Sequence, residues 1–154
     1  MAYHHSRFRN HAWARRVQDA PELRINPKTA MRLNIAQNDW VRVQTRRQMP
    51  RVFLKARLTD ELPGNIVATG MGWWYPEMCG PDHGASICNI DMAVPYGPPW
   101  DSITGSAEAR NTVCKVVRAE PGEVDELLRQ ARQAKPGIEA IPVSAAERLA
   151  ETQQ

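Results

Sequence analysis

The sequence predicts a mainly β domain with short helices, followed by a helical C-terminal tail. Two neighbouring segments alternate polar and apolar residues, which is typical of half-buried strands. A helix start, Asn-Pro-Lys-Thr-Ala, stands before them. From residue 123 onward the apolar residues recur at helical spacing instead. We therefore divide the 154 residues into a β-rich domain over 1–118 and a helical extension over 119–154.

The first residues, 1–20, are basic and aromatic with little periodicity, and they predict an extended arm or loop. A short helix follows. Asn26 can cap it, and Pro27 suits its first position because the missing N–H would be unpaired there in any case. Ala30 and Leu33 then face inward.

Four strands are predicted after this helix. Residues 40–45 and 51–58 alternate, and Gln48-Met49-Pro50 is the expected turn between them. A third strand is expected over 65–69 and a last one over 112–117. Asn38 lies in the turn before the first of these strands, where Asn tolerates positive φ. Several short alternating strands with one short helix indicate a closed all-β core.

The stretch between the last two strands, 70–110, has little regular pattern. Loops of this length are uncommon in compact domains and are commonly functional or disordered, and the aromatic residues argue against disorder. In the tail, residues 123–134 place acids first and arginines later, which suits a helix dipole. Ser144 and Glu147 form a capping box that opens a last short helix.

Charge is distributed unevenly along the chain. Residues 1–57 hold 13 Lys/Arg against 3 Asp/Glu, whereas residues 58–154 hold 7 against 14. The basic part suits an anionic partner, although a solvated basic face explains it equally well. No apolar run reaches the roughly 18 residues of a membrane helix, so we expect no membrane partner. Three cysteines in no tight pattern and the lack of a visible secretory signal predict a cytoplasmic protein, unless an export signal lies on a missing part.

No catalytic or metal-binding residue is assigned. Cys79, His83 and Cys88 lack the paired spacing of zinc ligands. We expect Cys88 and Cys114 to be buried small hydrophobic residues. The serines of the irregular stretch stand outside any G-x-S-x-G setting, and the chain has no P-loop.

Residues 70–89 are the most informative part of the chain. Two adjacent tryptophans stand beside glycines, and glycine in a strand packs nothing. This combination indicates a backbone approached closely by something planar, which is either the protein's own core or a ligand.

Five segments, taken in order, resemble one known family. They include His5-Ser6-Arg7-Phe8-Arg9-Asn10, Leu23 to Ala30, Leu33 to Val43, Leu62 to Ile66, and Gly72-Trp73-Trp74-Tyr75-Pro76-Glu77 up to Asn89. This order resembles the molybdopterin dinucleotide-binding domain, the C-terminal domain of dimethyl-sulfoxide-reductase-type molybdenum and tungsten oxidoreductases. The Trp-Trp-x-Pro-Glu piece looks like the branch that contains thiosulfate and polysulfide reductases, acetylene hydratase and transhydroxylase.

The resemblance implies a double-psi β-barrel of the aspartate-decarboxylase-like type. It also implies a molybdopterin guanine dinucleotide cofactor, with a planar pterin and a pyrophosphate, whose Mo or W is held by residues outside this chain. Arginines can bond the phosphate, polar side chains the pterin edges, and tryptophans can close over a flat ring. The implied cofactor-binding residues are His5, Ser6, Arg7, Arg9, Asn10, Trp73, Trp74 and Asn89. The familiar Asn-x-Leu-Thr of the family reads Asn89-Ile-Asp-Met here.

The metal ligands of the family lie in preceding domains, and nothing in this chain supplies them. The resemblance therefore implies a non-catalytic cofactor-binding fragment or subunit, partnered by the remaining domains or the catalytic subunit of the parent oxidoreductase. The alternative is a β-barrel binding module whose basic N-terminal arm contacts a protein or nucleic acid. A different small enzyme on the same barrel is a third reading. Nucleic acid is disfavoured because the aromatic-rich loop carries acids that would repel phosphates: Glu77, Asp82, Asp91 and Asp101.

Overall fold

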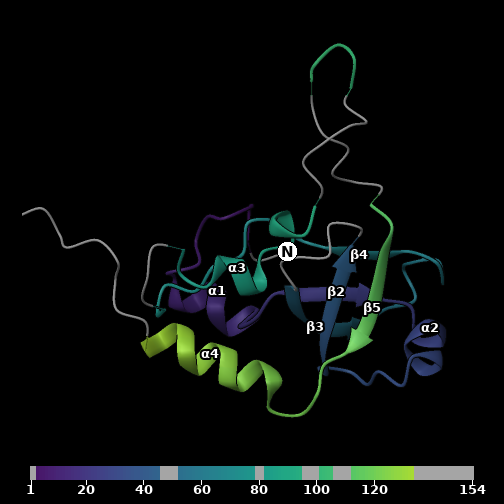
Figure 1. Cartoon of the computed structure of the whole chain (residues 1–154), viewed down its shortest axis with the longest axis horizontal. Coiled ribbons are helices and arrows are strands. Elements are labelled where there is room, and N and C mark those ends of the chain that lie inside the picture. The colour runs from purple at the N-terminus through teal and green to yellow at the C-terminus, as the bar shows by residue number, and fades with distance from the viewer. Residues whose placement is uncertain (1–2, 46–51, 79–81, 95–100, 106–111, 134–154) are drawn as a thin grey trace, which may run out of the picture.

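The computed structural model describes residues 3–45, 52–78, 82–94, 101–105 and 112–133, with side chains up to residue 129. Figure 1 shows a small twisted sheet with helices around it. The predicted turn at 48–50, Cys79 and the predicted helix from Ser144 lie outside these residues. In chain order the elements are α1 (Ala12–Val17), β1 (Glu22–Ile25), α2 (Pro27–Arg32), β2 (Trp40–Thr45), β3 (Val52–Leu58), β4 (Val67–Thr69), α3 (Ala85–Cys88), a 3₁₀ turn η1 (Ile90–Met92), β5 (Cys114–Arg118) and α4 (Glu123–Gln133).

The five strands form one sheet in the order β4-β1-β3-β2-β5. β1 pairs with β3 in parallel, whereas the other pairs are antiparallel. A parallel pair needs a crossover, and α2 together with β2 supplies it. Alternate residues of the strands bury one apolar face, and the main core cluster includes Leu23, Ile25, Val41, Val43, Leu54 and Ala56.

The predicted strands are confirmed, with small shifts at their ends. β2 has the predicted bounds, β3 begins at Val52, β4 covers only the end of the predicted 65–69, and β5 begins at Cys114. The sequence reading missed β1, because four residues are too few to show a period of two. The described residues form a mixed α/β structure around one five-stranded sheet, so they contain more helix than the mainly β expectation suggests.

The start of α2 follows the predicted chemistry. The Asn26 side chain accepts a hydrogen bond from the backbone N–H of Lys28 at 3.0 Å, and Pro27 holds the first helical position. Ala30 is fully buried as expected, but Leu33 is 41% exposed. The helix ends at Arg32, one residue before Leu33, and Ile35 is buried in its place. Asn38 has the expected positive φ, +66°.

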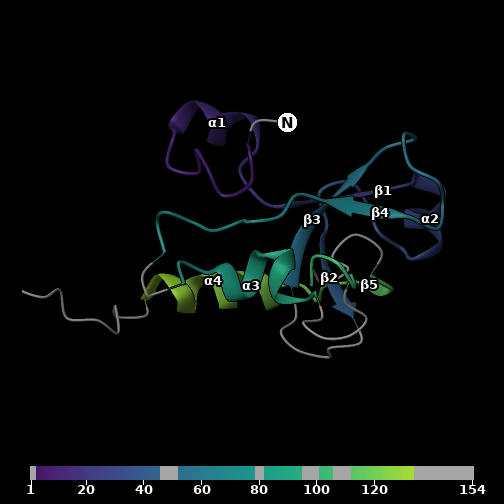
Figure 2. The ribbon, with the colours of Figure 1, turned by 90° about the horizontal axis from the view of Figure 1, so that it is seen from above.

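The N-terminal segment, residues 3–20, is folded and not extended, so of the expected arm or loop only the loop is present, in the turns over residues 4–10. It contains α1, whose Ala14 is fully buried, and two arginines in the last helical turn suit the dipole. In Figure 2, α1 lies on one side of the chain that follows β4, whereas α3 and α4 lie on the other side. A second core cluster fills the layer between them: Tyr3, Ala14, Trp73, Tyr75, Met78 and Cys88.

The predicted tail helix is present as α4. Val124 is buried against Phe53 of β3, and Arg42 bonds Glu123 at 3.3 Å. The beginning of the tail therefore packs on the sheet, while the boundary at residue 118 stays a prediction. Within the described parts of the chain, no helix combines the length and apolar character needed to cross a membrane.

Candidate functional site

A cavity of about 550 Å³ lies between the N-terminal segment and one end of the sheet. Its walls come from β1, from the end of β3 and the loop after it, and from the first residues of the stretch 70–89. The lining side chains include Tyr3, His4, His5, Arg9, Glu22, Arg24, Arg57, Glu61, Met71 and Trp73.

The cavity wall is predominantly basic. Three arginines and two histidines line it against two carboxylates, and both carboxylates already have partners. Arg57 bonds Glu22 at 3.1 Å, and Arg24 lies 3.8 Å from Glu61. The positive excess of the wall therefore comes from Arg9 in the N-terminal segment, because Glu22 and Glu61 offset Arg57 and Arg24. A wall of this kind attracts an anion.

Arg9 is the most unusual side chain of this wall. It is only 3% exposed, and its guanidinium carbon lies 4.0 Å from the ring centroid of Tyr3 and 3.8 Å from that of Trp73. Its Nη2 donates to the carbonyl of His5 at 2.8 Å, but Nε and Nη1 have no partner among the described residues. Burial lowers the pKa of Arg9, and the nearby Tyr3 opposes that shift.

Burying a half-bonded guanidinium is costly, because each unmade hydrogen bond leaves a desolvated donor. Trp73, on the same wall, also has a buried donor, Nε1, without a partner in the described part of the chain, as do Arg15 and Arg42, which do not line the cavity. Because Arg9 and Trp73 both line the cavity, a ligand there that brings acceptor atoms would satisfy their donors.

The two tryptophans have different surroundings. Trp73 is 2% exposed and packs edge-on against Tyr3 at 5.3 Å and against Tyr75 at 6.0 Å. It belongs to the core and reaches the cavity only from its wall. Trp74 is half-buried, and its Nε1 donates to the carbonyl of Ser6 at 2.8 Å. Of the two alternatives for the glycine-rich stretch, the protein's own core or a ligand, Trp73 therefore packs against the core.

Gly72 is the point of close backbone approach. Its φ is +72°, and a Cβ there would lie 2.9 Å from the backbone nitrogen of Ser6. Its N–H is shared by Asn89 Oδ1 at 3.0 Å and Asp91 Oδ2 at 3.1 Å. Asn89 Oδ1 also accepts from the N–H of Asp91 at 3.1 Å. The departure from the family's Asn-x-Leu-Thr thus adds a second acceptor for Gly72.

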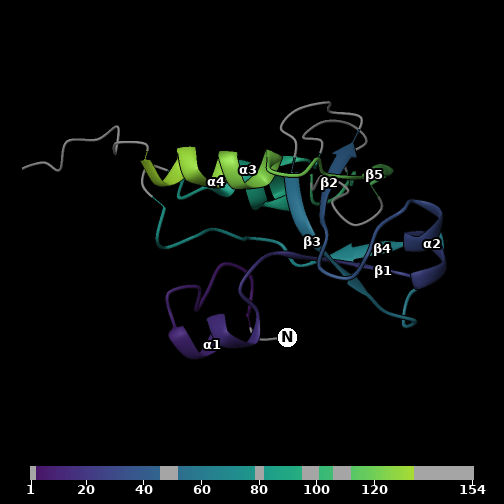
Figure 3. The same ribbon diagram turned by 90° about the horizontal axis from the view of Figure 1, so that it is seen from below.

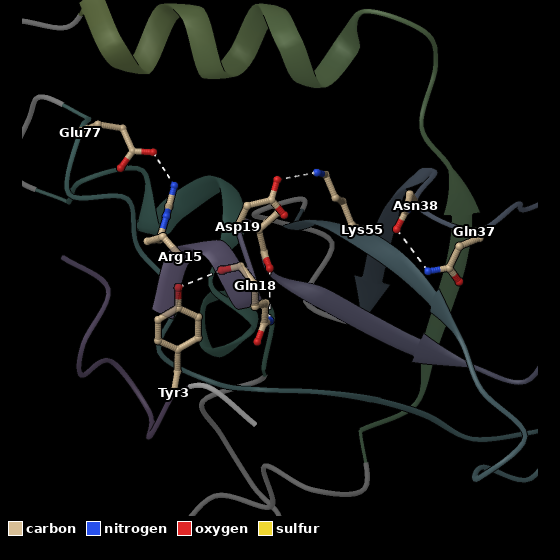
Figure 4. A network of polar contacts seen from close by, with 9 residues as sticks. Tyr3, Arg15, Gln18, Asp19, Gln37, Asn38, Lys55 and Glu77 are labelled. Atoms are coloured by element: carbon tan, nitrogen blue, oxygen red, sulfur yellow. Dashed lines mark hydrogen bonds and ion pairs between the residues drawn. The ribbon is translucent and has the colours of Figure 1, made fainter. Parts of the chain in front are cut away.

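Polar contacts fasten the N-terminal segment at several points (Figure 4). The Tyr3 hydroxyl donates to the carbonyl of Gln18 at 2.8 Å. Arg15 bonds Glu77 at 2.7 Å, and Lys55 bonds Asp19 at 3.0 Å. Exposed ion pairs contribute little stability on their own. They fix the orientation of a segment whose buried residues are Tyr3, Arg9, Ala14 and Ala20.

The structure brings part of the predicted site together. His5, Arg9 and Trp73 line the cavity, Ser6 and Trp74 are bonded to each other beside it, and Asn89 joins through Gly72. Arg7 and Asn10 are exposed and do not line the cavity. The sequence reading missed Tyr3, Arg24 and Arg57, and Arg24 was missed together with β1, whose four residues are too few to show an alternation. In the residues that the structure describes, no group of three His, Cys, Asp or Glu is placed to hold a metal ion.

The chain is similar to known proteins over most of its length. Residues 1–114 match the model of the Molydopterin dinucleotide binding domain. A dopamine dehydroxylase of Eggerthella lenta is 29% identical over 119 residues, which is 77% of this chain and 11% of that protein. An uncharacterized oxidoreductase of the same species gives the same values. The solved acetylene hydratase of Pelobacter acetylenicus has a similar fold, with a TM-score of 0.70 and 21% identity, over 77% of this chain and 17% of its own. The chain thus spans about a tenth of the length of the curated relatives it matches.

Proposed function

The chain belongs to the molybdopterin dinucleotide-binding domain family, and on this premise we propose that it binds a molybdopterin guanine dinucleotide within a larger molybdenum or tungsten oxidoreductase. The observation that carries the proposal is the buried, half-bonded guanidinium of Arg9 on a basic cavity wall. Because the chain spans 11% of a curated relative, we place the catalytic machinery on the remaining domains or a catalytic subunit of the parent.

The residues present fit the proposed cofactor. Its pyrophosphate and pterin offer oxygen and nitrogen acceptors, and the orphaned atoms at the cavity, Arg9 Nε and Nη1 and Trp73 Nε1, are all donors. Charge-assisted hydrogen bonds from a guanidinium to phosphate oxygens are among the strong ones, more so away from water. The basic excess of the wall suits the same anion.

Each residue has a distinct proposed part in holding this group. Arg9 and His5 face it from the N-terminal segment. Asn89 keeps its Oδ1 for Gly72 and offers the Nδ2 donor to the edge of the pterin. Arg7 and Asn10, exposed on the same segment, reach the cofactor from outside the cavity. The bound cofactor supplies the redox chemistry, and this domain orients it and adjusts its hydrogen bonding.

The finer fold proposal is a double-psi β-barrel. The mixed sheet supports it, since β1 and β3 are parallel among otherwise antiparallel pairs and α2 lies in the crossover. The fold likeness to acetylene hydratase also supports it. We expect the isolated chain to turn over no substrate, and a cytoplasmic location stays a prediction.

Tryptophan fluorescence tests the proposal directly. Extracted guanine dinucleotide cofactor should quench the emission of the chain saturably, because Trp73 lines the cavity. Arg9→Glu should weaken binding by about tenfold or more, since it removes charged hydrogen bonds. Arg32→Glu on the exposed part of α2 is the matched charge control and should bind like the natural chain.

Asn89 allows a finer test of its two side-chain atoms. Asn89→Asp keeps an acceptor for Gly72 but lacks the Nδ2 donor, whereas Asn89→Ala removes both. We expect both variants to weaken binding, and the Asp variant to keep the melting temperature closer to the natural value. Absence of saturable quenching by the natural chain at high micromolar cofactor, or equal weakening by Arg9→Glu and Arg32→Glu, would refute the proposed function.

A further inference from the structure

A row of exposed aromatic and apolar side chains runs along the outside of the N-terminal segment. Phe8 is 45% exposed, Trp13 53% and Val17 71%. Trp13 and Val17 stand four residues apart and share one face of α1. His11 joins the row, with ring centroids 5.7 Å from Phe8 and 6.5 Å from Trp13. We call these four residues the aromatic strip: Phe8, His11, Trp13 and Val17.

Contacts on the buried side of the N-terminal segment hold the strip in place. Arg9 is stacked on Tyr3 and Trp73, Ala14 is fully buried, and Arg15 bonds Glu77. Phe8 itself has a φ of +66°, which is unfavourable for a bulky residue. The fold therefore maintains a strained backbone that turns an aromatic ring toward solvent, and strain of this kind gathers at functional surfaces.

The aromatic strip is separate from the cofactor cavity. None of its four members lines that cavity, whereas their neighbours His5 and Arg9 do. Trp13 and Val17 lie on the exposed face of α1, and Phe8 and His11 lie in the chain just before it. In Figure 3, α1 stands away from α3 and α4, so these described helices leave its outer side uncovered.

We propose that the aromatic strip is a docking surface for the remaining polypeptide of the parent oxidoreductase. That polypeptide contacts the strip with an apolar patch that has an acidic rim. This inference rests on the proposed function. Most of each related protein lies outside the matched region, since the chain covers 11% of one and 17% of another. A contiguous exposed apolar patch of this kind marks a protein interface, and tryptophan is enriched at its energetic centre. The exposed Arg16 of α1 stands next to Val17 in the sequence and three residues after Trp13, and it specifies the acidic rim.

Photo-crosslinking in the source cells tests the surface. The tagged full chain carries p-benzoylphenylalanine in place of Trp13 or Val17, and a control chain carries it in place of Ile103, which is 92% exposed and far from the strip in sequence. Crosslinked partners are identified by mass spectrometry. We expect positions 13 and 17, and not 103, to crosslink to a polypeptide that holds the preceding domains of a molybdenum or tungsten oxidoreductase.

Introducing a negative charge into the strip provides the quantitative test. Trp13→Glu and Val17→Glu should reduce recovery of that polypeptide by about tenfold, as expected for central interface residues, whereas Ile103→Glu should not. The melting temperature and the cofactor quenching of the isolated variants should stay at the natural values, because both residues are exposed and outside the cavity.

Three outcomes would overturn the docking proposal. They are unchanged recovery with both Glu variants, crosslinks from the strip only to a second copy of this chain, and loss of cofactor quenching in the isolated Trp13→Glu chain. Failure of the proposed function has a different signature, because the natural chain would then show no saturable quenching whatever the crosslinks report.

Discussion

The guanidinium carbon of Arg9 lies 3.8 Å from the ring centroid of Trp73, and the two residues come from segments that are far apart in the sequence. The contact connects the N-terminal segment to the chain that follows β4. It also forms part of the cavity wall, since both residues line the cavity. The shape of the proposed cofactor site therefore depends on a buried cation between two aromatic rings.

Replacing Arg9 by Lys tests this dependence. A lysine ammonium is a compact point charge and cannot stack as a plane on the rings. We expect Arg9→Lys to lower the free energy of unfolding by about 1–3 kcal/mol, and trypsin to cleave the N-terminal segment faster. Arg7→Lys, at an exposed position, is the control and should leave both measurements unchanged. If Arg9→Lys resists trypsin as well as the natural chain does, the stacked guanidinium is dispensable for fastening the segment.

Local patterns in the sequence predicted those elements whose stability is local. The cap at Asn26, the alternation of β2 and the apolar spacing of α4 each lie within one element, and each was found. β1 escaped because its pairing partners, β3 and β4, define it more than its own four residues do. Leu33 was misplaced because the end of a helix depends on how the residues after it pack.

The candidate site was predictable as a set of residues but only partly as an arrangement. The resemblance named His5, Arg9 and Trp73, and they share a cavity. No pattern could show that Arg9 is buried on Trp73, because the contact depends on how the N-terminal segment folds back.

Cys88 is buried as expected, and burial raises the pKa of its thiol to about 12. Cys114 is only half-buried.

Gly72 and Gly70 form a matched pair of substitutions. A Cβ on Gly72 would meet the backbone of Ser6 at 2.9 Å, and the φ of +72° disfavours any side chain. No atom lies within 4 Å of a Cβ on Gly70. Gly72→Ala should destabilise the protein by about 1–3 kcal/mol and weaken cofactor quenching, whereas Gly70→Ala should be near neutral in urea denaturation. Equal midpoints for the two variants would contradict the close approach.

The two tryptophans should differ in their contribution to stability. Trp73 is 2% exposed within a packed cluster, so Trp73→Ala should cost about 3–5 kcal/mol as a large core truncation. Trp74 is half-buried, and its truncation should cost about 1 kcal/mol, mainly through the lost hydrogen bond to Ser6. Chemical denaturation followed by far-UV circular dichroism measures both. A larger loss in Trp74→Ala would place the structural tryptophan at the other position.

Asp82 gives the stability of the protein a predictable dependence on pH. Its carboxylate accepts from the N–H of Gly84 at 3.2 Å and of Ser86 at 3.1 Å, just before and within α3. Hydrogen bonds from Ser86, followed by those from Gly84, hold the pKa of Asp82 below its ordinary value. A depressed carboxyl pKa stabilises the fold above the unfolded value of about 3.9, and that contribution is lost as pH falls through the lower folded value.

Asp82→Ala should therefore be less stable than the natural chain by about 1 kcal/mol at pH 7, and the difference should shrink progressively below about pH 4. Urea denaturation at both pH values measures it, with the exposed Asp60→Ala as the control. A difference that persists undiminished in acid would mean that Asp82 acts through packing and not through its charge.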